Sequence, residues 1–412
     1  MKKTVSVILC IALLLSVFSV TAFAAESGEE STSYPFIFVH GMGGWGSDGK
    51  LESTSPYWGN TQNLMDMLRS EGNEVYNPGV GPFSSAWDRA CELYAQLTGT
   101  VVDYGEKHSS EMKHARYGKD YTGKATMGEP WDMSTPVNLV GHSFGGVTVR
   151  LLASLLVYGD EHEKTDPNCS ELFKGGHTNA VHSVTTLSAP HNGSVVSNYF
   201  YDSRIIVFLM GLLSNYTAVT GKEISIMSTW DMNLDQWGLT GENAKFSLKN
   251  AFRFAKAKDN CGYDLTIRGA AEINKKIKTV ENAYYYSYTS SCTEENMLGY
   301  QQVAYDSMYS IFKLSSTLIN LSQWLFVDGV FLDKSWSEND GIVPLKSGLY
   351  PFTDENNHDD FVTAQEIKPG IWYTMPTLYG TDHYDFCQAD AGDIEGGYME
   401  FYNNMIKTVN AN

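Results

Sequence analysis

The stretch from Val137 to Gly146 constrains this chain most, because it joins a short apolar run to a Gly-x-Ser-x-Gly pentapeptide. Residues 137–140 (VNLV) lead into residues 141–145 (GHSFG), and a helix-patterned run over 147–159 (VTVRLLASLLVYG) follows. This order predicts a strand, a sharp turn that presents Ser143 as a nucleophile, and a helix. A side chain at Gly141 or Gly145 would crowd such a turn, so the two glycines support the same interpretation.

Other short apolar runs predict further buried strands at residues 35–39, 181–187, 284–289 and 371–373, with helical patterns between them. Strands that alternate with helices indicate a mostly parallel sheet covered on both faces. Together with a serine turn at the end of a strand, this pattern predicts the α/β-hydrolase fold. Two stretches, 83–131 and 221–261, exceed what that core requires. We interpret them as insertions that form an accessory subdomain.

The first 24 residues have the pattern of a secretory signal peptide. Lys2 and Lys3 precede an apolar run over residues 5–20, and Ala22-Phe23-Ala24 gives the small-x-small pattern of a cleavage point. A membrane anchor is the alternative interpretation, although the run is near the short end for a spanning helix. We therefore expect a secreted, extracellular protein with a short acidic and polar leader at 25–33 and one hydrolase domain at 34–412.

Charge and cysteine content narrow the classes of partner. The chain carries 48 acidic and 29 basic residues, a formal net charge of −19. Such an acidic surface argues against nucleic acid and anionic membranes as partners. Beyond the predicted signal, the cysteines are odd in number and scattered, so no disulfide framework is expected: Cys91, Cys169, Cys261, Cys292 and Cys387.

A nucleophilic serine needs a histidine base and an acid that orients it, in the chain order Ser, acid, His in this fold. His191 would precede every later acid, and His358 sits in the acidic loop 353–360. His383 follows a predicted strand and precedes the last helical segment, which is the position expected of the base. For the acid we select Asp340, in the turn sequence 337–344 (SENDGIVP). Spacing alone leaves Asp333 and Glu338 as alternatives.

The oxyanion of such a reaction needs two backbone N–H donors. One is predicted at Phe144, directly after the nucleophile. The other is expected in the glycine-rich loop 40–46 (HGMGGWG), where we select Met42. A phosphate-binding loop is excluded because no Gly-Lys-Ser/Thr follows.

At this point the chain resembles a known family, the secreted zinc- and calcium-binding true lipases of Gram-positive bacteria. These are the thermostable bacillus lipases and their staphylococcal relatives. The resemblance covers nearly all of residues 34–412 and favours Asp340 and His383 over the alternatives. Its specific stretches are 39–41 (VHG) with 44–46 (GWG), 81–92 (GPFSSAWDRACE), 102–105 (VDYG), 114–118 (HARYG), 234–239 (LDQWGL) and 338–343 (ENDGIV).

The resemblance implies two structural metal ions. Zinc would be held by Asp88, His108, His114 and Asp235, and carboxylate and imidazole ligands suit tetrahedral zinc. Because these positions fall in both predicted insertions, the ion would tie the insertions together. Calcium would be held near the catalytic histidine by Asp385, Asp390 and the carbonyl groups of Ala391 and Gly299. The family commonly has glutamate where Asp385 stands and proline where Ala391 stands, so a weaker calcium site is expected.

The resemblance also implies a lid. Residues 198–218 (NYFYDSRIIVFLMGLLSNYTA) are strongly apolar, as expected for a helix that covers the serine in water and opens on lipid. An ordinary buried helix would have the same composition.

The sequence therefore predicts an extracellular triacylglycerol lipase that works through a Ser-His-Asp triad and an acyl-enzyme, as a monomer in transient contact with lipid–water interfaces. The alternatives are a phospholipase or short-chain carboxylesterase on the same scaffold, or a binding protein on an inactive one.

Overall fold

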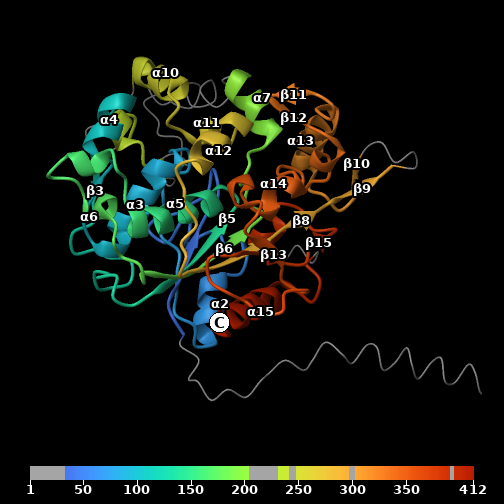
Figure 1. Ribbon diagram of the computed structural model, residues 1–412, viewed down its shortest axis with the longest axis horizontal. Coiled ribbons are helices and arrows are strands. Elements are labelled where there is room, and N and C mark those ends of the chain that lie inside the picture. Colours follow the sequence, from blue (N-terminus) through green and yellow to red (C-terminus); the bar gives the residue numbers. More distant parts are fainter. Residues whose placement is uncertain (1–32, 204–230, 241–246, 297–301, 390–393) are drawn as a thin grey trace, which may run out of the picture. The chain divides into compact units, whose positions relative to one another are not determined.

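A computed structural model describes residues 33–203, 231–240, 247–296, 302–389 and 394–412 (Figure 1). A seven-stranded, fully parallel sheet organises this part of the chain, in the order β13-β14-β7-β6-β5-β1-β2. Its strands are β1 (Phe36–Val39), β2 (Val75–Tyr76), β5 (Val137–His142), β6 (Val181–Leu187), β7 (Tyr284–Tyr288), β13 (His358–Asp360) and β14 (Trp372–Thr374). All five strands expected from the apolar runs are present.

Side chains along each strand point alternately to the two faces of the sheet, where they pack into two separate cores. Ile37 and its partner Leu139 pack on one face, whereas Phe38 and its partner Val140 pack on the other. Because each strand is buried on both faces, its sequence is a continuous apolar run rather than an alternating one.

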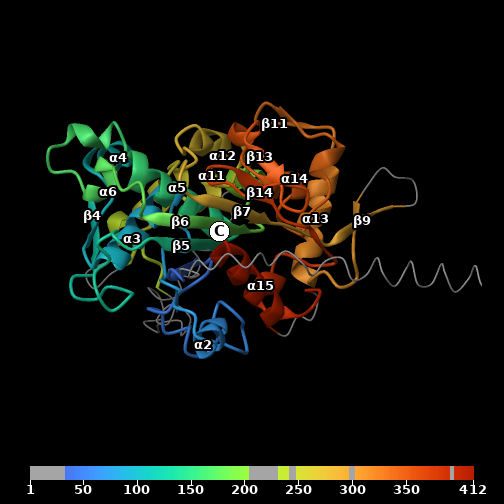
Figure 2. The ribbon, with the colours of Figure 1, turned by 60° about the horizontal axis from the view of Figure 1, so that its bottom comes forward.

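Helices cover both faces, as Figure 2 shows. One face packs against α3 (Ala86–Thr98) and α5 (Phe144–Tyr158), and the other packs against α2 (Leu64–Ser70) and α15 (Tyr398–Asn410). This two-sided arrangement and the serine turn between β5 and α5 confirm the expected α/β-hydrolase architecture.

The remaining elements are short. The helices are α4 (Glu106–Met112), α6 (Glu171–Lys174), α7 (Val195–Ser203), α10 (Leu248–Lys256), α11 (Cys261–Asp264), α12 (Ile267–Asn274), α13 (Ser310–Leu321) and α14 (Leu345–Leu349). Single 3₁₀ turns are η1 (Glu163–Thr165), η2 (Asp235–Trp237), η3 (Lys334–Trp336), η4 (Phe352–Asp354) and η5 (Asp385–Cys387). The two-stranded sheets are β3 (Val101–Asp103) with β4 (Tyr117–Asp120), β8 (Ser290–Ser291) with β15 (Leu378–Tyr379), β9 (Thr293–Glu295) with β10 (Gln302–Ala304), and β11 (Phe326–Val327) with β12 (Val330–Phe331).

Helix α3 begins the segment 83–131, yet it belongs to the main body of the fold. Ser85 caps it by accepting a hydrogen bond from Asp88 N, and Gly99 ends it in the left-handed region (φ +63°). Its apolar face, which includes Leu93 and Leu97, shares one core with α5 and the sheet. Val102, Tyr121 and Trp131 from the rest of the segment join the same core, so the segment is not accessory throughout.

The structure also describes the acidic loop 353–360 and the cysteines. The acidic loop 353–360 is not loop throughout, because its last residues form the edge strand β13. The five cysteines beyond the predicted signal are buried free thiols. Among the described residues, no helix has the length and apolar character needed to cross a membrane.

Candidate active site and metal centre

Ser143 occupies a strained turn between β5 and α5, with φ +54° and ψ −128°. An L-residue reaches this region only when its surroundings force it there. The flanking glycines allow the necessary close approach. A Cβ on Gly141 would lie 2.4 Å from the Gly145 carbonyl carbon, and one on Gly145 would lie 2.2 Å from the Val39 carbonyl oxygen. The turn predicted from the pentapeptide is therefore present.

Ser143, His383 and Asp340 form one continuous hydrogen-bonded chain. The Ser143 Oγ lies 2.9 Å from His383 Nε2, and His383 Nδ1 lies 2.7 Å from Asp340 Oδ2. The other carboxylate oxygen of Asp340 accepts from the backbone N–H groups of Ile342 (3.0 Å) and Val343 (2.7 Å). All three side chains are buried, so solvent does not compete for these bonds.

The alternatives Asp333, His191 and His358 have other partners. Asp333 accepts from Ser335 N (2.9 Å) at the start of η3, and Glu338 is half-buried. His191 is buried beside Thr186, and His358 stacks on Tyr350 with 3.7 Å between ring centres. The structure thus brings together the three residues that chain order and the family resemblance favour.

The glycine-rich loop lies directly over the serine. A Cβ on Gly41 would lie 2.7 Å from the Ser143 Cβ, which measures how closely the loop backbone approaches. Met42, the next residue, is 41% exposed. Phe144 opens helix α5, so its N–H is one of the first-turn groups without an intrahelical acceptor. The two residues predicted as oxyanion donors therefore belong to the two segments that meet at the serine, the glycine-rich loop and the start of α5.

A buried arginine holds this loop in place, and sequence reasoning missed its role. Arg89 reaches from α3 to donate to the carbonyl oxygens of His40 and Gly81 and to Thr148 Oγ1 (2.9 Å) on α5. Burial lowers the pKa of Arg89 to about 10, which leaves the guanidinium charged at neutral pH. Arg89 therefore links the loop to the helix that begins with Phe144. Its acceptors are mostly backbone carbonyls, which leave no mark in the sequence.

A second chain of hydrogen bonds joins the loop to the catalytic histidine. Gly41 N–H donates to Tyr57 Oη (2.9 Å), Tyr57 O–H donates to His142 Nδ1 (2.7 Å), and His142 Nε2–H donates to the His383 carbonyl (2.9 Å). The two ends are fixed because a backbone N–H only donates and a carbonyl only accepts, and in a neutral ring that donates from Nε2 the Nδ1 atom must accept from Tyr57. Burial, and next the neighbouring His383, lowers the pKa of His142 well below its usual value, which agrees with a neutral ring.

Asp88, His108, His114 and Asp259 form a buried cluster that could hold a metal ion. Their ligand atoms all lie within 4.8 Å of one another. Asp88 Oδ1, His108 Nε2, His114 Nε2 and Asp259 Oδ2 are buried polar atoms without a well-aligned hydrogen bond, as expected of groups that ligate an ion. His114 Nδ1 donates to the Ala115 carbonyl (2.8 Å), which leaves its Nε2 free to bind metal.

The cluster corrects one predicted ligand, because Asp259 rather than Asp235 supplies the fourth group. Asp235 is half-buried in η2 and accepts a hydrogen bond from Thr240 (2.8 Å). The neighbouring Gln236 still supports the site by donating to Asp88 Oδ2 (2.7 Å). Both aspartates fall in the segment 221–261, so residue type and approximate position did not distinguish them. The cluster still joins that segment to 83–131.

The predicted calcium site and lid fall largely outside the described residues. Gly299, Asp390 and Ala391 lie outside them, as do residues 204–218 of the lid segment. Asp385 is described: it is buried, and its carboxylate accepts from Asp382 N (2.6 Å). The lid segment begins on α7, which follows the loop from Asn192 to Ser194.

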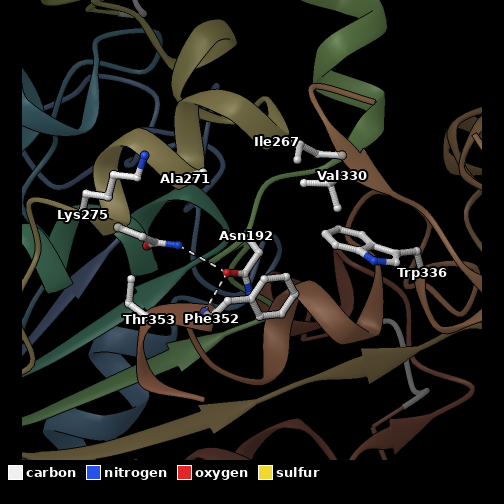
Figure 3. Close-up of a pocket in the computed structure, with 9 residues that line it drawn as sticks. Asn192, Ile267, Ala271, Lys275, Val330, Trp336, Phe352 and Thr353 are labelled. Carbon is white, nitrogen blue, oxygen red and sulfur yellow. Dashed lines mark hydrogen bonds between the residues drawn. The ribbon is translucent and has the colours of Figure 1, made fainter. Parts of the chain in front are cut away.

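A separate cavity of about 250 Å³ lies beneath this loop (Figure 3). Asn192 Oδ1 accepts hydrogen bonds from Phe352 N (2.9 Å) and Asn274 Nδ2 (3.3 Å) at its wall. Ile267, Val330 and Trp336 make the opposite side apolar, and none of the three triad residues lines it. The cavity is therefore distinct from the Ser143 site.

Comparisons with known proteins agree with this architecture. Residues 32–411 match the family model described as "Lipase-like, C-terminal domain". The chain is 34% identical to Lipase 1 of Staphylococcus aureus (strain NCTC 8325 / PS 47) over 383 residues, which are 90% of this chain and 53% of that protein. The chain belongs to this lipase-like family. The resemblance to staphylococcal lipases inferred from the sequence stretches is thereby confirmed.

Two solved structures of similar proteins support the same assignment. Staphylococcus hyicus lipase is 32% identical and aligns with a TM-score of 0.77, covering 95% of this chain and 98% of that one. EstA from Clostridium botulinum is 35% identical with a TM-score of 0.75, covering 90% and 87%. The chain spans about half the length of the curated relatives it matches.

We expect Asp259→Asn to lose most of its bound divalent metal, because an amide oxygen is a much weaker ligand than a carboxylate. Asp235→Asn is the matched control and should retain the metal, since Asp235 lies outside the cluster. Elemental analysis of dialysed protein measures the metal content of both variants. We expect the metal affinity of Asp259→Asn to fall by at least about 100-fold. Equal metal content in the two variants would contradict the assignment.

Proposed function

We propose that this protein is an extracellular triacylglycerol lipase, a serine carboxylic-ester hydrolase that acts on acylglycerols. The observation that carries the proposal is the buried chain from Ser143 to His383 to Asp340, with contacts of 2.9 and 2.7 Å. Members of its family carry the name lipase, which favours lipid esters over other esters as substrates. A phospholipase or short-chain carboxylesterase would use the same residues on a different ester.

In the acylation step, Ser143 Oγ attacks the ester carbonyl carbon while His383 Nε2 accepts the serine proton. The resulting imidazolium is stabilised by Asp340, which also holds Nδ1 as the protonated nitrogen. Because Ile342 N and Val343 N donate to the second oxygen of Asp340, the carboxylate is held in the orientation that meets His383 Nδ1.

Negative charge develops on the carbonyl oxygen during this attack. We assign its stabilisation to the backbone N–H groups of Met42 and Phe144. The Phe144 N–H lies at the positive end of α5, which adds the helix dipole to the hydrogen bond. Arg89 does not reach the reacting atoms in this assignment. It is a positioning residue that holds the loop before Met42.

The tetrahedral intermediate collapses when His383 donates its proton to the departing alcohol, which leaves an acyl group on Ser143. Water then enters, His383 accepts its proton, and attack on the acyl carbonyl releases the fatty acid and regenerates the serine. No redox group is needed, because electrons are not gained or lost.

We assign zinc to the cluster of Asp88, His108, His114 and Asp259. Two imidazole nitrogens and two carboxylate oxygens suit a closed tetrahedral site. The role is structural, since the cluster joins two distant segments and contacts none of the triad residues. We further propose calcium at Asp385, with Gly299, Asp390 and Ala391 completing the set. There it would hold the segment that follows His383.

The proposed setting is outside the cell, at a lipid surface, as a monomer. The signal-like pattern over residues 1–24 and the acidic composition support export as a soluble protein. The apolar segment 198–218 supports the proposal of a lid that opens on lipid.

Ser143→Ala is expected to reduce the rate of p-nitrophenyl ester hydrolysis by at least about 10³-fold, because no other nucleophile replaces the serine. Circular dichroism should show an intact fold. An acyl-chain series from butyrate to oleate, measured below and above substrate solubility, separates lipase from short-chain esterase. Wild-type turnover by pure Ser143→Ala protein would refute the proposed mechanism.

Asp340→Asn should reduce kcat by about 10⁴-fold, because an amide favours the wrong imidazole tautomer of His383. Asp333→Asn and Glu338→Gln are matched controls from the same region and should keep nearly full turnover. Assays with a soluble ester measure kcat for all three variants. Similar losses in the three variants would leave the acid unassigned.

Tyr57→Phe should lower kcat by about tenfold or more with little change in KM, since it breaks the chain from Gly41 to His142 and loosens both catalytic segments. The buried Gly41 N–H loses its partner and His142 Nδ1 keeps only Cys387 Sγ (3.3 Å), so stability also falls, by about 1–3 kcal/mol. Tyr76→Phe is the control, because its hydroxyl bonds Glu74 at the surface. A stability loss without a kcat loss would exclude a positioning role.

A further inference from the structure

Helix α13 and the hairpin β11–β12 present an apolar surface to solvent, which we call the α13 face. Its side chains are between 43% and 75% exposed, and an exposed apolar patch of this kind marks an interaction site more often than a scattered apolar residue does. The members are Ile311, Leu314, Leu321, Trp324, Leu325, Phe326 and Phe331.

The helix is apolar on both of its sides. Phe312 and Ile319 point inward and are buried, as the inner face of a surface helix requires. Ile311, Leu314 and Leu321 follow the same helical spacing on the outer side, where polar residues are expected. The outer stripe therefore does not serve the core of this domain.

The inner side fixes the α13 face in position. Ile319 packs with Leu332 and Trp336 in a small core that also holds Val195 and Val196 from the start of α7. Figure 1 shows α13 and the β11–β12 hairpin beside α7. The exposed side chains are thus held on a packed support rather than on a loose loop.

The same helix touches the catalytic residues. The Phe312 ring packs edge-on against His383, with 6.2 Å between ring centres, and against Tyr384 at 4.7 Å. Ser315 Oγ donates to the Gly341 carbonyl (2.5 Å), next to Asp340. Any surface that covers the outer side of α13 therefore lies close to the triad.

Charge identifies the kind of partner. Lys313 is the single ionisable residue of α13, and the whole chain carries a formal charge of −19. An anionic surface would be repelled by this protein, and the face offers few charged groups to a polar partner. Aromatic and aliphatic side chains with Trp324 among them suit the boundary between lipid headgroups and acyl chains.

We propose that the α13 face docks on the surface of an uncharged or zwitterionic lipid aggregate and so brings Ser143 to its substrate. This inference deepens the proposed function and rests on it for the substrate. The face is separate in sequence from the predicted lid at 198–218.

The test measures lipid binding apart from hydrolysis. In a Ser143→Ala background, Leu314→Ser with Phe326→Ser removes two of the most exposed members of the face, at 71% and 75%. Val362→Ser with Tyr117→Ser is the matched control, since these side chains are 70% and 56% exposed elsewhere on the chain. Sedimentation with phosphatidylcholine vesicles gives the partition coefficient of each protein.

We expect the face variant to bind these vesicles at least tenfold more weakly, while the control binds as the parent does. With Ser143 restored, the face variant should hydrolyse a monomeric short-chain ester normally and emulsified triacylglycerol at least tenfold more slowly. Unchanged vesicle binding overturns the proposal, and so does a preference for phosphatidylserine vesicles.

Two other occupants give distinct results, each of which overturns the proposal. If a second copy of the chain covers the face, sedimentation velocity without lipid shows a dimer that the face variant loses, with vesicle binding unchanged. If another segment of the same chain covers it, the face variant melts at lower temperature, again with vesicle binding unchanged.

Failure of the docking proposal and failure of the proposed function are separable. Face-dependent vesicle binding without any Ser143-dependent ester hydrolysis would retain the docking surface and reject the lipase. Ser143-dependent hydrolysis, with vesicle binding that does not depend on the α13 face, would retain the lipase and reject the docking surface.

Discussion

The site depends on one steric constraint, the backbone of Ser143 held at φ +54°. The strain persists because β1, β5 and α5 converge there with no room for a side chain at Gly141 or Gly145. The parallel sheet places β1 beside β5, and the apolar runs of both strands set that pairing. The reactive geometry of the serine is therefore a product of sheet packing, and the core residues behind it act on the site through backbone position.

Around this turn, the rest of the site is held together by buried polar groups. Arg89 links the glycine-rich loop to α5, and Tyr57 with His142 links the same loop to the backbone of His383. Buried polar groups are costly when unpaired, so such chains have few alternative arrangements. This favours a preformed site, in which the oxyanion loop and the histidine segment do not move independently.

Much of this was predictable from sequence, and the exceptions have a common cause. Five strands and the serine turn follow from apolar runs and turn residues, which are local signals. Chain order selected His383, whereas the choice of Asp340 over Asp333 and Glu338 needed the family resemblance. Asp259 could not be separated from Asp235, because ligation depends on where distant segments meet. Arg89 was missed as well, since most of its partners are backbone carbonyls. The edge strands β2 and β13 are too short for a recognisable pattern.

The edge strand β13 has a consequence for the protein in concentrated solution. Strand edges carry unpaired backbone groups that can template the addition of another chain. Here the edge consists of His358, Asp359 and Asp360, all exposed, at the end of an acidic run. Two copies that approached along this edge would bring like charges within a few ångströms of each other. Like-charge repulsion along β13 thus disfavours fibrous self-association at this edge, and the edge does not need a covering helix or loop for that purpose.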